Sequence, residues 1–298
     1  MDHYKLKKKL SLITENITSI IESRNTHKII AISLFTLLIL LIFYTTWHTS
    51  PYLSGKKSLF TIEAKTNYIE ISPHKNGNYP TWEIEKGRLY DNCSKDSEIS
   101  FSGSVFINPY STIEFINDLS ETLVIYLNSE SDTSSGRVIT NTAEIMLSDC
   151  AALKIDNSLE SIFLIDGVIE LGTEVNENTT NNAILKSGSV TISDKRIFSN
   201  DYYQNTPRPL KMGDKFLVKL PESQSSGFVH FKRGQYMYTS YQSTGQEGVI
   251  QRYKSEDIII KNSIWDKIKN DDILTFLWIA IIFTSGLIRT FIMLIRKP

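Results

Sequence analysis

The sequence predicts an all-β domain, built as a sandwich, a jelly roll or stacked β-structure, flanked by two transmembrane α-helices. Three observations support this prediction. Residues 29–47 contain no charged side chain, residues 273–295 contain one, and the chain between them consists of short runs rich in β-branched and aromatic residues. A formal net charge of −1 for the whole chain gives no sign of this division.

The first apolar run, residues 29–47, follows a basic tail that comprises residues 1–28. At about 1.5 Å per residue this run approaches the hydrocarbon thickness of a membrane, roughly 30 Å. No small-x-small cleavage pattern follows it, so an uncleaved anchor is favoured over a signal peptide. In the tail, Leu6, Leu10 and Ile13 recur at helical spacing, which allows either a helix on the anionic membrane surface or a coiled coil with a partner.

The second apolar run, residues 273–295, contains Arg289 near its end. This arginine lies close to one membrane face, where its long side chain can reach the headgroups beside Arg296 and Lys297 in the terminal segment 296–298. A second role stays open, in which Arg289 binds a packed partner helix.

The orientation follows from the basic residues that flank both runs, because lysine and arginine near membrane ends stay in the cytoplasm. Both termini are therefore expected in the cytoplasm of a bacterium, and residues 48–272 in the periplasm. Trp47 and Trp265 are expected at the membrane interfaces. The expected partners are membrane lipids and either another membrane protein or further copies of this chain, with no nucleic acid.

Residues 48–272 show the pattern of a β-rich domain, with short extended runs separated by segments rich in Asn, Ser, Pro and Gly. Strands are predicted at residues 58–64, 67–72, 81–90, 98–108, 122–128, 137–148, 161–171, 183–193, 214–220, 227–231, 235–241 and 256–261.

The two cysteines, Cys93 and Cys150, both fall in this external domain. An oxidising compartment permits a disulfide between them, and the alternative is two unrelated buried thiols. We expect the disulfide.

No HExxH, CxxC, GxSxG or P-loop pattern occurs, and the external histidines His48, His74 and His230 lie far apart in the sequence. No catalytic residue, metal site or cofactor is therefore predicted. The segment KRGQYMYTSY offers a candidate partner surface, because alternation places two of its tyrosines on one face of a strand. Ordinary strand aromatics that half cover a sheet are the alternative. The candidate residues are Arg233, Tyr236, Tyr238 and Tyr241.

The segment PTWEIEKGRLYDNCSKDSEISFSGSVFIN, residues 80–108, resembles the membrane-anchored periplasmic β-jellyroll component of lipopolysaccharide transport. There, too, a Trp-containing strand is followed by a G-x-V strand. The resemblance covers about a tenth of the chain and implies a lipid-handling jellyroll, without assigning any site residue.

Three functional hypotheses result. The first is a non-enzymatic scaffold or sensor subunit, whose external β-domain binds a protein, glycan or lipid partner within a membrane complex. The resemblance supplies the second, a lipid-handling jellyroll. The third is an envelope hydrolase whose catalytic residues are dispersed along the sequence.

Overall fold

The computed structural model describes residues 57–72, 79–93, 98–118, 122–130, 133–155, 160–173, 175, 183–196, 201–219 and 225–296, together with 33, 35–41 and 43–44. The chain forms two compact units. Residues 56–195 and 201–263 make up the β-domain, and residues 1–55, 196–200 and 264–298 make up the helical unit.

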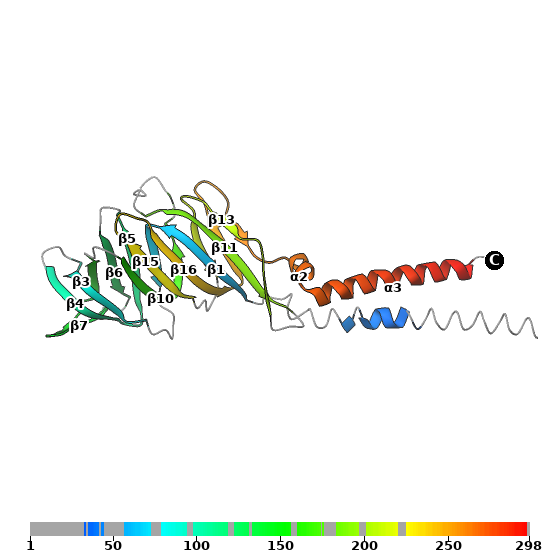
Figure 1. The fold of residues 1–298 in the computed structure, drawn as a ribbon, viewed down its shortest axis with the longest axis horizontal. Helices are drawn as coiled ribbons and strands as arrows, with labels where there is room; N and C mark the ends of the chain where they lie inside the picture. Colours follow the sequence, from blue (N-terminus) through cyan, green and yellow to red (C-terminus); the bar gives the residue numbers. More distant parts are fainter. Residues whose placement is uncertain are drawn as a thin grey trace, which may run out of the picture. The chain divides into compact units, whose positions relative to one another are not determined.

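In the β-domain, the described strands are antiparallel and hydrogen-bonded into one continuous network (Figure 1), which confirms the predicted all-β class. The network divides into two sheets that share strand β10 (Glu160–Leu171). Sheet 1 has the order β12 (Tyr202–Gln204) and β13 (Arg208–Leu210), β11 (Leu185–Lys195), β1 (Ser58–Thr66), β16 (Met237–Gly245), β15 (Ser225–Lys232), β10.

Sheet 2 continues from the second part of β10. On one side of β10 lie β14 (Lys215–Lys219), β17 (Glu247–Gln251) and β18 (Ile258–Ile260). On the other side the order is β2 (Tyr68–Ser72), β5 (Ser111–Asn117), β6 (Leu123–Ser129), β9 (Cys150–Ile155), β3 (Trp82–Asp91), β4 (Glu98–Ile107), β7 (Gly136–Thr140), β8 (Glu144–Met146).

Strand β10 passes from one sheet to the other at Gly167. Residues 160–167 pair with β15 in sheet 1, and residues 168–171 pair with β2 in sheet 2. Gly167 has a φ of 140°, and a Cβ atom there would lie 2.7 Å from the Ser72 carbonyl oxygen. The bend therefore requires glycine, both for its backbone conformation and for its close contact with β2.

The chain also changes sheet at Asn67, the single residue between β1 and β2. Asn67 is buried, and both of its backbone polar groups are satisfied. Its N–H donates to the Ile184 carbonyl at 3.2 Å, and its carbonyl accepts from the Asn117 N–H at 2.9 Å. A sharp corner can thus be buried without unpaired backbone groups.

One hydrophobic core takes side chains from both sheets. At its centre the rings of Trp82, Phe115 and Phe163 form a triangle with centroid separations of 5.4, 5.5 and 5.7 Å. The Trp82 Nε1–H also donates to the Leu164 carbonyl oxygen at 2.8 Å. Because Phe163 and Leu164 lie in the sheet 1 part of β10, this cluster fastens β3 of sheet 2 to sheet 1.

The expected disulfide is confirmed between Cys93 and Cys150, whose Cα atoms lie 5.5 Å apart. It joins the turn after β3 to the first residue of β9, so it crosslinks strands that are already hydrogen-bonded. Asn92 and Cys93 have φ values of 52° and 51°, which turn the chain toward Cys150. The Asn92 N–H donates to Ser148 Oγ at 2.9 Å and helps to hold this turn.

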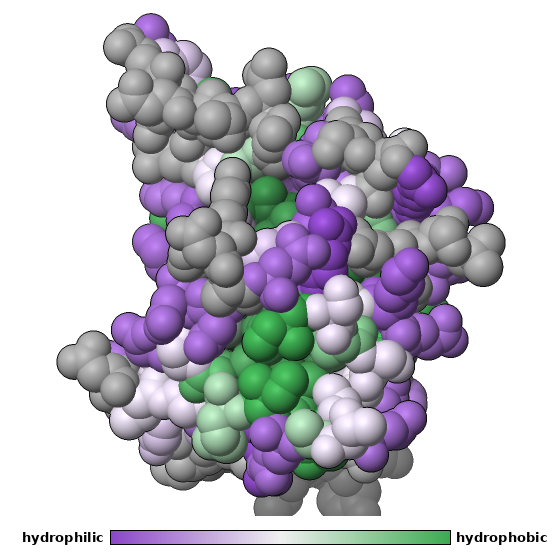
Figure 2. Space-filling view, turned by 90° about the vertical axis from the view of Figure 1, so that its left-hand side faces the viewer, coloured by the Kyte–Doolittle hydropathy of each residue, from purple (hydrophilic) through white to green (hydrophobic). Residues whose placement is uncertain are grey.

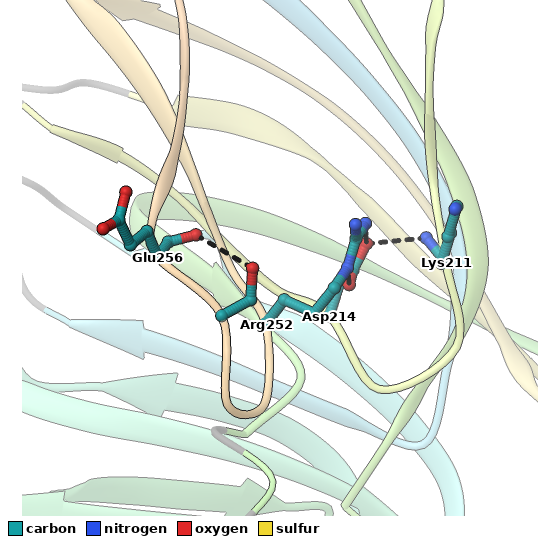
Figure 3. Close-up of polar contacts among 5 residues, drawn as sticks. Lys211, Asp214, Arg252 and Glu256 are labelled. Carbon is teal, nitrogen blue, oxygen red and sulfur yellow. Dashed lines mark hydrogen bonds and ion pairs between the residues drawn. The ribbon is translucent and has the colours of Figure 1, made fainter.

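An ion pair fixes the turn between β13 and β14 to the residue after β17 (Figure 3). The Arg252 guanidinium donates to the two Asp214 carboxylate oxygens at 2.8 and 3.0 Å. The Lys211 N–H donates to Asp214 Oδ2 at 2.8 Å. The hydrogen bonds from Arg252 to Asp214, together with the Asp214 charge, raise the pKa of Arg252. The Asp214 side chain is fully buried, so the carboxylate depends on these donors.

In the helical unit, α2 (Ile264–Asn270) is followed by α3 (Asp272–Arg296). Asp271 caps α3, because its Oδ1 accepts from the N–H groups of Ile273 and Leu274 at 3.1 and 3.2 Å. Arg196 forms an ion pair with Asp272 at 2.9 Å. Residues 33, 35–41 and 43–44 are also helical.

Within the part of the chain that the structure describes, no helix combines the length and the apolar character needed to cross a membrane. The tail at residues 1–28, much of the predicted span at 29–47 and the end at 297–298 lie outside the described residues, as do the side chains of residues 290–296.

The sequence prediction missed five strands and merged two. The run at 137–148 is divided between β7 and β8, and the missed strands are β5, β9, β12, β13 and β17. Strand β9, with the sequence CAALKI, contains two alanines, which have low β-propensity. It forms because it is packed between β6 and β3, and that packing outweighs local preference.

Removal of the disulfide is expected to destabilise the β-domain by about 3–4 kcal/mol, because it releases the closed loop between Cys93 and Cys150 in the unfolded chain. Chemical denaturation of Cys93→Ser and of the double serine variant should show the same loss, with reductant changing only the wild type. A wild-type midpoint that does not respond to reductant would contradict the prediction.

Replacement of Asp214 with alanine should destabilise the fold by about 3 kcal/mol, because it removes the buried acceptor of the bonds described above. Glu144→Ala is the matched control, since the Arg137–Glu144 pair has a similar distance, 3.0 Å, but is about half exposed. That variant should change stability by less than about 1 kcal/mol. Equal effects of the two substitutions in urea titrations would refute the assignment.

Candidate functional site

The outer face of sheet 2 carries a continuous row of polar and aromatic side chains. The inner face at the intervening positions is buried core, such as Phe115, Ile125 and Leu153. The outer row follows the strand register from β10 to β4 and consists of Glu170, Glu70, Glu114, Tyr126, Ala152, Tyr90 and Glu98.

A hollow occurs in this row where a small residue lies between two tyrosines. Ala152 on β9 is flanked by Tyr126 on β6 and Tyr90 on β3. Neighbouring strands lie about 4.8 Å apart, so the tyrosine backbones are separated by about 10 Å with only a methyl group between them. The resulting depression, which we name the tyrosine slot, has a volume of about 400 Å³ and is lined by Tyr90, Cys93, Glu98, Val124, Tyr126, Ala152 and Lys154.

The polar groups of the tyrosine slot are unevenly paired. Glu98 accepts a hydrogen bond from the Tyr90 hydroxyl at 2.8 Å and lies 3.5 Å from the Arg88 guanidinium. Lys154 lies directly opposite Arg88 in the β3–β9 register. Among the described residues, the Lys154 ammonium has no hydrogen-bond or ion-pair partner. Like charges placed opposite each other destabilise a sheet, so this placement does not favour folding.

A second depression lies beside the first, at a bulge in β3. The register of β3 against β4 shifts between Ile84 and Gly87, which adds one residue to β3. A Cβ atom at Gly87 would lie 3.0 Å from the Phe101 ring, so glycine permits the close packing. The hollow has a volume of about 490 Å³ and is lined by Glu85, Lys86, Gly87, Arg88, Ser100, Phe101 and Ser102.

Figure 2 views the end of the β-domain that carries β3, β4 and β7. It shows a compact group of apolar residues bordered by hydrophilic ones. Exposed apolar side chains on strands of this end include Ile99 on β4 and Met146 on β8. Apolar surface within a polar rim is typical of protein surfaces that bind a partner.

Three glutamates extend the row away from the tyrosine slot. Lys215 pairs with Glu170 at 2.7 Å, and the Tyr68 hydroxyl donates to Glu70 at 3.1 Å. Burial, and then the Glu70 charge, raises the pKa of Glu114. Burial, followed by the charges of Glu70 and Glu114, also raises the pKa of Tyr68.

Within the described residues, no group of three or more His, Cys, Asp or Glu side chains is placed to hold a metal ion.

Of the four surface residues predicted from the sequence, one is buried in the structure. Tyr238 is on the outer face of sheet 1, with its ring 6.1 Å from that of Phe228. Tyr236 precedes β16 and lies 5.6 Å from the Lys186 ammonium. Tyr241 is 2% exposed and belongs to the core, while Arg233 lies in the turn between β15 and β16. Tyr241 therefore does not belong to an open surface, while the candidate surface of Arg233, Tyr236 and Tyr238 stays a prediction.

The remaining predicted residues fall in the helical unit. Trp265 is 71% exposed on α2, and Arg289 is exposed on α3. Arg296 is the last residue of α3, but its side chain is not among the described ones. Trp47 and Lys297 lie outside the described residues.

Of the three external histidines, only His230 is described, and it forms an ion pair with Glu160. His48 and His74 lie outside the described residues.

Apart from Cys93, which was predicted as a disulfide partner, the residues of the tyrosine slot were not predicted from the sequence. Alternation in the run at 122–128 does place Val124 and Tyr126 on one face. The missing signal was β9, which inserts Ala152 and Lys154 between β6 and β3. Because β9 was not predicted as a strand, nothing in the sequence brought Tyr126 near Tyr90.

The raised pKa of Glu114 predicts a pH-dependent effect of Glu114→Gln. A carboxyl whose folded pKa is above its unfolded value favours folding below the unfolded pKa, about 4.3, and this advantage is lost as pH rises through the folded pKa. The variant should therefore gain melting temperature relative to wild type at pH 7 and little at pH 4. Glu63→Gln is the control, since Glu63 is exposed and opposite Ser189 and Ser240. An equal shift at both pH values would contradict the prediction.

Comparison of the chain with models of protein families, with curated proteins and with solved structures finds no match.

Proposed function

We propose that this protein is a non-enzymatic binding subunit of a membrane complex, a scaffold or sensor whose β-sandwich domain presents the tyrosine slot to a ligand. The observation that carries the proposal is the free ammonium of Lys154 on β9, opposite Arg88 and beside Ala152, which lies between Tyr90 and Tyr126. Tyrosine and arginine are favoured where proteins bind partners. An ammonium group without a partner, placed opposite a second cation in a solvated depression, fits a binding surface better than a stabilising one.

The proposed location is the bacterial inner membrane, with two spans, both termini in the cytoplasm and residues 48–272 in the periplasm. The sequence supports this through two apolar runs and their basic flanks. The Cys93–Cys150 disulfide fits an oxidising compartment. On α3, Phe276, Ile279 and Phe283 are 69, 59 and 67% exposed, which suits contact with lipid or a second helix.

The two alternatives have less support from the structure. A lipid-handling jellyroll needs an open apolar groove, but core side chains occupy the space between the two sheets, and both described depressions carry charged groups. A hydrolase needs converging carboxylate and histidine groups in a depression. The His230–Glu160 pair contributes to neither described depression, and its Glu160 side chain is 56% exposed.

The function is tested by asking whether partner retention depends on the slot. Full-length protein would be extracted in mild detergent, and copurifying molecules identified by mass spectrometry. Ala152→Leu, which fills the tyrosine slot, should lose at least one component that wild type retains. Tyr238→Ala, which alters the outer face of sheet 1, should retain it. Identical sets from wild type and Ala152→Leu would count against the proposal.

The topology predicts the behaviour of reporter fusions that are active only outside the cytoplasm. Fusions after Ser54 or after Asn262 should be active, and a fusion at Pro298 should be silent, because the basic flanks keep both termini inside. The opposite pattern would overturn the orientation.

A further inference from the structure

We propose that the ligand of the tyrosine slot is an uncharged saccharide, bound with one ring between Tyr90 and Tyr126. This inference rests on the proposed binding function and gives it a chemical class. Four features of the tyrosine slot support it: the two tyrosine walls, the hydrogen-bonding groups, the surrounding charge and the second depression beside it.

The walls match the thickness of one ring. The two tyrosine backbones are about 10 Å apart across β9, and a ring in van der Waals contact needs about 3.5–4 Å on each side. The side chain of Ala152 is too short to fill this gap, so a sugar ring can enter between the aromatic faces. A volume of about 400 Å³ falls within the usual range of small-ligand sites.

The polar groups require a ligand that both donates and accepts hydrogen bonds. The Glu98 carboxylate only accepts, and the Lys154 ammonium only donates. Neighbouring hydroxyl groups of a sugar satisfy both at once. A proline-rich peptide offers mainly ring methylenes and carbonyl acceptors, so it would add few donors to those that Glu98 already receives from Tyr90 and Arg88.

The charge of the surrounding face disfavours an anionic polymer. The carboxylates of the outer row outnumber the cations near them: Glu70, Glu98, Glu114 and Glu170 against Arg88, Lys154 and Lys215. A chain of negative groups extending from the tyrosine slot along this row would meet Glu114 next to Tyr126. A neutral ligand avoids that repulsion.

The second depression provides room for an adjoining sugar unit. Arg88 lines it and also pairs with Glu98 of the tyrosine slot, so the two hollows meet at this ion pair. Ser100 and Ser102 line the second hollow. Their hydroxyls can donate and accept, which again matches a saccharide. The ligand is therefore expected to be an oligosaccharide of at least two units.

The test uses full-length protein in a polyoxyethylene detergent, because a detergent with a sugar headgroup would compete for the slot. Calorimetric titration would use di- to tetrasaccharides of glucose, mannose and N-acetylglucosamine, a tetramer of a uronic acid, and a proline-rich decapeptide. At least one neutral oligosaccharide should bind, and more tightly than the uronic acid tetramer or the peptide.

Variants locate the binding. Ala152→Leu and Tyr126→Ala should raise the dissociation constant of the oligosaccharide at least tenfold. Tyr126→Phe, which keeps the ring and removes only the hydroxyl, should raise the dissociation constant by about two- to fivefold. This variant remains informative if the larger changes disturb folding. Tyr238→Ala should bind as wild type does. Circular dichroism and melting curves would confirm the fold of each variant.

The outcomes separate this inference from the proposed function. If no neutral oligosaccharide binds, or if Ala152→Leu binds it unchanged, the saccharide assignment is overturned. A decapeptide or uronic acid that binds more tightly, and in a slot-dependent manner, also overturns it. In each of these cases, copurification that still depends on Ala152 would leave the binding function standing. If neither saccharide binding nor copurification depends on Ala152, both proposals are rejected.

Discussion

The bend of β10 at Gly167 is the constraint on which the β-domain depends. Because of this bend, β10 is the last described strand of sheet 1 and also an interior strand of sheet 2. Residues 160–167 have β15 on one side and, among the described strands, none on the other. The Trp82 indole N–H donates to the Leu164 carbonyl there, which satisfies a partly buried acceptor and brings Trp82 against Phe163. The hydrogen bond to the Leu164 carbonyl, on the open side of β10, thereby sets the position of β3, which lies several strands away in sheet 2.

The bulge in β3 then converts this core contact into an exposed site. Trp82 and Ile84 point into the core at even positions, whereas Leu89 points into it at an odd position. The additional residue between Ile84 and Gly87 causes this change, because an extra residue reverses which side chains face outward. Without it, Arg88 and Tyr90 would face the core. The same strand therefore anchors the domain at one end and lines both depressions at the other.

The sequence was sufficient for the elements with strong local signals. Alternating strands were predicted from residue pattern and the pairing of the only two cysteines from their count and compartment, and the all-β class and the disulfide are confirmed. The two membrane spans predicted from the apolar runs stay a prediction. The order of strands was not predictable in the same way. Strand β9 has weak β-propensity and lies between β6 and β3 through contacts distant in sequence. The slot depends on that order and on a bulge within EIEKGR, so neither tyrosine was identified as a site residue.

Unfavourable charge placement distinguishes the outer face of sheet 2 from that of sheet 1. In sheet 2, Arg88 is opposite Lys154, and Glu70 is opposite both Glu114 and Glu170. In sheet 1, Glu63 is opposite two serines, Ser189 and Ser240. Like charges in register cost stability, and natural sequences retain such local conflicts mainly where function requires them. The conflicts on sheet 2 lie in and beside the tyrosine slot, while the inner face beneath the slot carries apolar core residues such as Phe115, Ile125 and Leu153. The face whose charges are least favourable for folding is therefore the face to which we assign the proposed binding function.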